Sequence, residues 1–158
     1  MFMKISKFVV SIALCQSAGL LGSFFTIPAI PTWYATLNKP AFSPPNWLFS
    51  PVWISLYTLM GISLFLIWNK TEKRPYRRKA LVFFFIQLIL NALWSVFFFG
   101  LRSPLAGLIE MAFLWSTIVL TTFYFFKLAR WAGILLLPYL AWVSFAFILN
   151  FSLWTLNR

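Results

Sequence analysis

Five long apolar runs are the feature that most constrains this chain. They lie at about residues 8–27, 47–68, 80–99, 104–126 and 131–155, and each is close to the roughly 20 residues that a helix needs to cross a bilayer. Because the runs are continuous and do not alternate with polar residues, they disfavour a β-barrel. With only 9% charged residues, the chain also has too little polar surface for a soluble globule. The sequence predicts an all-α integral membrane protein, a five-transmembrane-helix bundle that forms one domain over residues 1–158.

The positive charges indicate how this bundle is oriented. On an up-and-down path, ten of the 13 basic residues fall on one membrane face, namely Lys4, Lys7, Lys70, Lys73, Arg74, Arg77, Arg78, Lys79, Lys127 and Arg130. Lys39, Arg102 and Arg158 fall on the other face. This asymmetry predicts a cytoplasmic N-terminus and an external C-terminus. The basic stretch TEKRPYRRK is then a topology signal next to anionic lipid, so we expect no nucleic-acid partner.

Few residues in this chain can support familiar catalytic or metal chemistry. There is no His, one Cys (Cys15), and two acids, Glu72 and Glu110. One chain therefore cannot assemble a metal cluster, a disulfide or a His-based triad, and we predict no metal site, no cofactor and no catalytic residue of these kinds. Glu110 lies inside an apolar run, which makes it a functional candidate. It can equally be protonated and hydrogen-bonded, or paired with Arg102 at the rim.

Three of the runs carry distinctive faces. Small residues recur in the first at every fourth position (Ser11, Cys15, Gly19, Ser23), which predicts close helix packing. In the third, Gln87, Asn91 and Trp94 share a face, so the two amides must point into the bundle. Interhelical hydrogen bonding and ligand contact both explain them. In the fifth, Ala146 is a small residue among Trp142, Phe145 and Leu149, which indicates either plain packing or a pocket.

The first connection, at about residues 28–46, is unusually rich in proline. Six of the nine prolines lie in or beside it (Pro28, Pro31, Pro40, Pro44, Pro45, Pro51). Proline fixes the backbone, so a segment such as KPAFSPPNW has a defined shape that a flexible linker would lack. At about 1.5 Å per residue, Trp53, Trp94, Asn91 and Ala146 all lie within roughly 15 Å of the same membrane surface. We therefore expect the loop to act as a lid over them.

The stretch from Trp33 to Gly61, WYATLNKPAFSPPNWLFSPVWISLYTLMG, resembles the signature of the TspO/MBR family, the translocator proteins. QLILNALWSVFFFG and PYLAWVSFAFILN resemble that family's third and fifth helices. The resemblance implies a five-helix bundle, often a homodimer, which binds tetrapyrroles in a pocket closed by the first loop. In some members it also implies binding of cholesterol or benzodiazepine-type drugs. The pocket positions carried over by motif are Tyr34, Trp53, Asn91, Trp94, Trp142, Ala146 and Leu149.

The chain departs from the cholesterol-recognition pattern of animal members, since Phe151 stands where that pattern needs tyrosine. The leading expectation is thus a bacterial cell-membrane protein that binds porphyrin or haem by stacking on Trp and Tyr, with a hydrogen bond from Asn91. One alternative is light- and oxygen-dependent porphyrin breakdown, in which Trp53 and Trp142 take part. The other is a porphyrin transporter, for which Glu110 would carry a proton.

Overall fold

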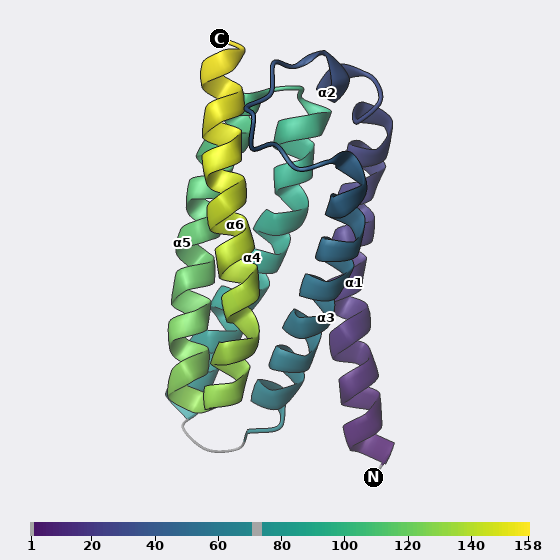
Figure 1. The fold of residues 1–158 in the computed structure, drawn as a ribbon. Helices are drawn as coiled ribbons and strands as arrows, with labels where there is room; N and C mark the ends of the chain where they lie inside the picture. The colour runs from purple at the N-terminus through teal and green to yellow at the C-terminus, as the bar shows by residue number, and fades with distance from the viewer. Residues whose placement is uncertain (1, 71–73) are drawn as a thin grey trace.

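Five long helices make up most of the protein (Figure 1). The computed structural model describes residues 2–70 and 74–158 of the chain. The long helices are α1 (Phe2–Ala29), α3 (Phe49–Trp68), α4 (Arg74–Ser95), α5 (Pro104–Leu128) and α6 (Arg130–Leu156). Each is long and apolar enough to cross a membrane, and the described residues contain no strand. The prediction of an all-α five-helix membrane bundle is confirmed.

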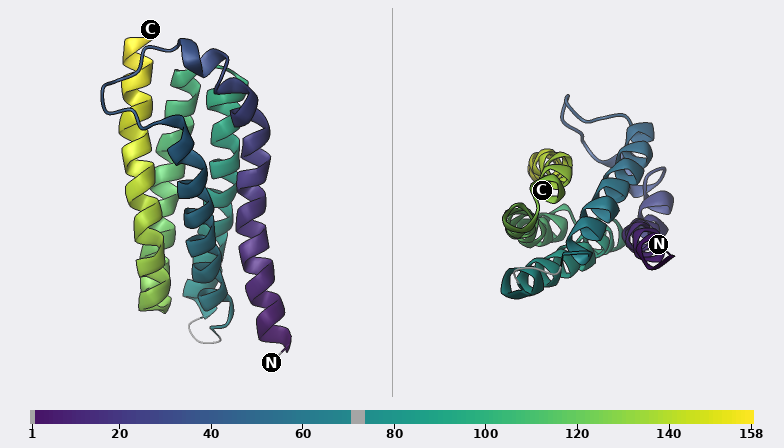
Figure 2. Two further views of the ribbon diagram at one scale, coloured as in Figure 1. Left: turned by 45° about the vertical axis from the view of Figure 1, so that its right-hand side comes forward. Right: turned by 90° about the horizontal axis from the view of Figure 1, so that it is seen from below.

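The five helices form a closed ring in which each contacts two main neighbours. Going around it, α1 packs on α3, α3 on α6, α6 on α5, α5 on α4, and α4 on α1. The N-terminus and the C-terminus lie at opposite ends of the ring, as Figures 1 and 2 show. An odd number of antiparallel crossings produces this arrangement. It gives the bundle one end with the N-terminus and one end with the first loop, called here the basic end and the loop end.

Two connections at the loop end contain more regular structure than the sequence indicates. The loop after α1 contains the short helix α2 (Trp33–Thr36) and a 3-10 turn (Asn46–Leu48) directly before α3. After Ser95 the backbone widens into a π-helix (Val96–Gly100). The next helix starts at a conventional cap, where Ser103 Oγ accepts a hydrogen bond from the Ala106 N–H. Glu72 and Lys73, which belong to the predicted basic stretch, lie outside the described residues.

Small residues allow α1 and α3 to approach closely. A Cβ atom added to Gly61 would lie 2.7 Å from the Ile12 Cα atom. Gly19, on the predicted small-residue face of α1, lies against the ring of Tyr57. Cys15 of the same face is fully buried, so it is a packing residue as the sequence indicates. Such close backbone contact replaces the hydrophobic driving force that helices lack inside lipid.

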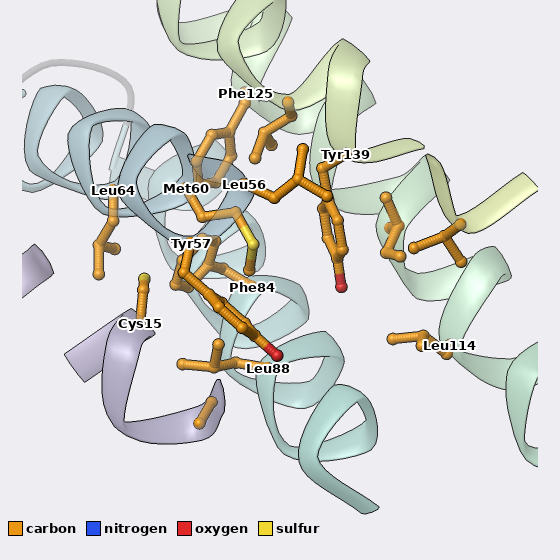
Figure 3. Packing of buried hydrophobic residues seen from close by; sticks show 14 of the residues in the cluster. Cys15, Leu56, Tyr57, Met60, Leu64, Phe84, Leu88, Leu114, Phe125 and Tyr139 are labelled. Carbon is orange, nitrogen blue, oxygen red and sulfur yellow. The ribbon is translucent and has the colours of Figure 1, made fainter. Parts of the chain in front are cut away.

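The packed core fills the basic half of the bundle. Buried side chains from all five long helices meet there, and Figure 3 shows Met60, Leu64, Phe84 and Phe125 among them. Phe84 and Phe125 stack with their ring centroids 5.6 Å apart. A second, smaller cluster lies at the loop end around Phe98 and Phe99.

The α1–α3 contact predicts the effect of one added methyl group. Gly61→Ala should lower the free energy of unfolding by about 1–3 kcal/mol, because the new Cβ meets the backbone of α1, which cannot move aside cheaply. Unfolding in detergent micelles measures the change. Ser55→Ala, at an exposed position of the same helix, is the control and should leave stability nearly unchanged. Equal stability of the wild type and Gly61→Ala would contradict the close approach.

Candidate functional site

A cavity of about 400 Å³ lies in the loop half of the bundle. All five long helices contribute to its wall, and Tyr34 of α2 reaches it from the loop. The structure brings all seven sequence-predicted site residues to this one cavity: Tyr34, Trp53, Asn91, Trp94, Trp142, Ala146 and Leu149. Their role in ligand binding stays a prediction. Their convergence explains why the dent at Ala146 matters, since a larger side chain there would enter the cavity.

Three indole rings form the aromatic wall, and each is held by a neighbouring ring. Trp53 stacks on Tyr57, with centroids 5.4 Å apart and planes at 28°. Trp94 stacks on Phe98 at 5.0 Å and 18°. Trp142 meets Phe49 edge-on at 6.2 Å. Aromatic pairs of these geometries stabilise a fixed orientation, so the cavity presents largely preformed flat surfaces.

A chain of hydrogen bonds crosses the bundle beside the cavity. Tyr57 of α3 donates to Asn91 Oδ1 of α4. Asn91 Nδ2 donates to the Tyr139 hydroxyl of α6 at 2.9 Å, and that hydroxyl donates to Gln87 Oε1 of α4 at 2.8 Å. Figure 3 shows how Tyr57 and Tyr139 reach into the core from their two helices. The two amides therefore serve interhelical bonding, and Asn91, which also lines the cavity, is engaged on both atoms of its amide.

Asn150 is a site residue that the sequence reasoning missed. It lines the cavity, its side chain is 1% exposed, and neither amide atom has a hydrogen-bond partner among the described residues. The amide nitrogen lies against α5, 3.2 Å from where a Cβ on Gly107 would stand. Trp94 Nε1 also lacks a partner within the described chain. Asn150 could have been found from its spacing, because it is one turn beyond Ala146 on the same helix.

Glu110 is buried on α5, one turn beyond Gly107 on the same helix. Neither of its carboxyl oxygens forms a hydrogen bond with any residue that the structure describes. The alternative in which Glu110 is hydrogen-bonded is therefore not supported by the described residues. Its neighbour Met111 lines the cavity, whereas Glu110 does not. Glu110 is therefore a buried carboxyl group outside the cavity wall, without a hydrogen-bond partner among the described residues.

The first loop contributes Ile30 and Tyr34 to the cavity wall and is fastened to the end of α6. Asn157 Oδ1 accepts a hydrogen bond from the Asn38 N–H, and Asn157 Nδ2 donates to the Asn38 carbonyl, both at 2.9 Å. The next residue, Lys39, places its ammonium group 4.7 Å from the centre of the Tyr34 ring. Burial raises the pKa of the Tyr34 phenol above its ordinary value, so Tyr34 stays neutral. Asn38 and Asn157 carry no sequence signal, because two amides 119 positions apart show no periodicity.

These surroundings suit an apolar ligand and disfavour metal coordination by protein side chains. Within residues 2–70 and 74–158 there is no group of three or more His, Cys, Asp or Glu side chains that could hold a metal ion. The cavity wall is mostly apolar, with stacking surfaces on several sides. Cavities of this volume, with a few polar groups in a mostly apolar and aromatic wall, are typical binding sites for small hydrophobic molecules.

The sequence model of the TspO/MBR family matches residues 11–155. This chain belongs to the TspO/MBR family. It is 48% identical to the tryptophan-rich protein TspO of Archaeoglobus fulgidus over 155 residues, which cover 98% of this chain and 99% of that protein. It is 44% identical to the protein of the same name from Chlorobaculum tepidum, over 98% of both chains. It is also 36% identical to the human translocator protein, over 80% of this chain and 75% of that one.

The hydrogen-bond chain of this TspO/MBR protein predicts a stability effect. Tyr139→Phe removes the acceptor of Asn91 Nδ2 and the donor to Gln87 Oε1. It should lower the free energy of unfolding by about 1–3 kcal/mol, because two buried amides lose a partner. Tyr76→Phe is the matched control, since Tyr76 is 48% exposed at the start of α4. If both variants unfold like the wild type in micelles, the network contributes nothing to stability.

Proposed function

We propose that this TspO/MBR protein is a membrane-embedded binding protein for tetrapyrroles such as porphyrin or haem. The observation that carries the proposal is the cavity of about 400 Å³ whose walls hold Trp53, Trp94 and Trp142. A flat aromatic macrocycle stacks favourably on indole rings, and its insertion buries a large apolar area. Since the chain has no His, we expect stacking to dominate over iron ligation, so metal-free porphyrin should bind about as well as haem.

Within this proposal, Asn150 and Trp94 supply the polar contacts to the ligand. Asn91 had this role in the interpretation of the sequence, but its amide is already bonded to Tyr57 and Tyr139. Asn150 has a free donor and a free acceptor among the described residues, and Trp94 has a free donor. Unpaired polar groups in a buried wall gain most from a ligand that pairs them. A ligand with polar groups at its edge therefore suits this cavity better than a pure hydrocarbon.

Narrowing the cavity should weaken binding. Ala146→Val adds two methyl groups to the wall beside Trp142, and it should weaken protoporphyrin binding by about 1–3 kcal/mol, the usual cost of overpacking. Titration with monitoring of tryptophan fluorescence quenching gives the affinity. Ala141→Val is the matched control, because it makes the same change at an exposed position of the same helix. Identical affinities for the wild type and both variants would place the ligand outside this cavity.

The loop should control how fast the ligand leaves. Asn157→Ala removes both hydrogen bonds to the Asn38 backbone, and Pro44→Gly with Pro45→Gly raises the entropy that the loop loses on closing. Each change should destabilise the ordered loop by about 1 kcal/mol or more, and it should speed porphyrin release roughly tenfold. Stopped-flow fluorescence measures the release rate at a temperature where all proteins are folded. Ser152→Ala, at a half-buried position on α6 where the hydroxyl bonds only its own helix, is the control. Unchanged release in both loop variants would mean that the loop is only a spacer.

Two other activities remain part of the proposal as alternatives. Trp53 and Trp142 both line the cavity, where light- and oxygen-dependent porphyrin breakdown would expose them to oxidation. Bleaching of bound porphyrin under light, faster with the wild type than with Trp53→Phe or Trp142→Phe, would assign that activity. Porphyrin uptake into vesicles that depends on Glu110 would assign transport instead. Sterol-like and benzodiazepine-type ligands are proposed only as further occupants of the same cavity.

The setting of the protein is proposed from its charge distribution and its family. We place it in a bacterial cell membrane, with the basic end in the cytoplasm, the loop end outside, and two copies forming a homodimer. The excess of Lys and Arg at the basic end supports this orientation. A reporter fused after Arg158 that works only outside the cytoplasm tests the orientation, and cross-linking in native membranes tests the dimer.

A further inference from the structure

A groove at the basic end of the bundle lies far from the proposed tetrapyrrole cavity. It has a volume of about 500 Å³ and is lined by Pro75, Arg78, Lys79, Val82, Phe83 and Tyr124. These residues belong to the first turns of α4 and the last turns of α5, which lie side by side at the end of the bundle opposite the loop (Figure 1). The groove shares no lining residue with the cavity at the loop end. It is therefore a separate surface.

An aromatic set builds one side of the groove. The rings of Phe83 and Tyr124 stack almost parallel, with centroids 5.6 Å apart and planes at 7°. The ring of Tyr76 packs against that of Tyr124, with the ring centroids 6.4 Å apart. Val82, beside them, is 49% exposed. This side of the groove is thus an apolar, ordered surface that faces outward from the bundle.

Two cations line the same groove. Arg78 and Lys79 are exposed, and neither has a hydrogen-bond or ion-pair partner for its side chain within the described residues. Arg77, by contrast, donates to the Lys70 carbonyl at 2.6 Å. The helix dipole at the start of α4 adds further positive potential nearby. The groove therefore combines an apolar wall with two cations that have no partner among the described residues.

The depth of the groove along α4 limits which class of molecule can occupy it. The part of α4 that is long and apolar enough to cross a membrane begins at Pro75. Arg78 and Lys79 therefore lie near the end of this stretch, where we expect the headgroups, while Val82 and Phe83 lie about one turn deeper. A phosphopeptide or nucleic acid would leave the apolar wall uncovered. An anionic phospholipid fits both the cations and the apolar wall, because its phosphate can contact the cations while one acyl chain packs along the wall.

We propose that this groove is a binding site for an anionic phospholipid, with the headgroup phosphate between Arg78 and Lys79 and an acyl chain along Val82, Phe83 and Tyr124. The site goes beyond tetrapyrrole binding and does not depend on it. It also goes beyond a topology signal, because a topology signal needs only the net charge of a segment. The proposed site needs these particular cations beside this particular wall.

Lipid selectivity of the purified full-length protein tests the site. Binding of phosphatidylglycerol and of phosphatidylcholine is measured by native mass spectrometry, with lipid added to the protein in micelles. The wild type should prefer phosphatidylglycerol roughly tenfold to thirtyfold, the size expected for two basic side chains near a negative group. The variant with Arg78→Gln and Lys79→Gln should lose most of that preference. Should this variant not fold, the two single variants supply the same comparison with smaller losses.

A matched control separates a built site from diffuse charge. Lys4→Gln with Lys7→Gln removes the same charge from α1 at the same end of the bundle and should keep the preference for phosphatidylglycerol. Equal losses in both double variants, or no preference in the wild type, would overturn the proposal. Glycerol 3-phosphate in excess should compete only weakly, because it has no acyl chain. Competition as strong as that of the lipid itself would make the groove a phosphate site and overturn the lipid assignment.

Discussion

The structure depends on hydrogen bonds between polar side chains that are buried in the membrane-spanning part of the bundle. Tyr57, Asn91, Tyr139 and Gln87 form a continuous chain of hydrogen bonds that joins α3, α4 and α6. Since lipid offers no competing partner, leaving any of these groups unpaired is costly. The chain therefore fixes the rotation and depth of the three helices that it joins. It also lies where the packed basic half of the bundle gives way to the cavity, so the position of the cavity follows from it.

A different set of contacts holds the first loop at the loop end of the bundle. Apart from α2 and the 3-10 turn, the first loop has no regular secondary structure that would hold its shape. Prolines limit its backbone, α2 brings Tyr34 inward, and the Asn38–Asn157 pair ties it to the end of α6. The last turn of α6 therefore helps to hold the loop at this end of the bundle. Under the proposed function, a stiff loop fastened in this way can open as a unit to admit a ligand.

The sequence predicts the features that follow from periodicity and length. Five spans, the inward face with Gln87 and Asn91, and the dent at Ala146 all follow from the spacing of residues along a helix. The family motif adds the convergence of the seven cavity residues. The Asn38–Asn157 pair and the widened turn after Ser95 are not predictable in this way, because each depends on which atoms of distant segments meet. The spacing places Asn150 on the face of Ala146, but it does not predict that the Asn150 amide lacks a partner among the described residues. Sequence spacing gives the face of a residue, whereas hydrogen-bond partners depend on tertiary packing.

The difference in packing between the two halves of the bundle also helps to distinguish binding from transport under the proposed function. A transporter needs a route from the cavity to the opposite membrane surface, built from elements that can rearrange. In the described residues that route is filled by Met60, Leu64, Phe84, Ile118 and Phe125, all 1% exposed or less. Opening it would separate closely packed rings and the α1–α3 contact at Gly61, which costs far more than releasing a loop held by a few hydrogen bonds. Under the proposed function, this packed basic half favours binding and retention of a ligand over its passage through the bundle.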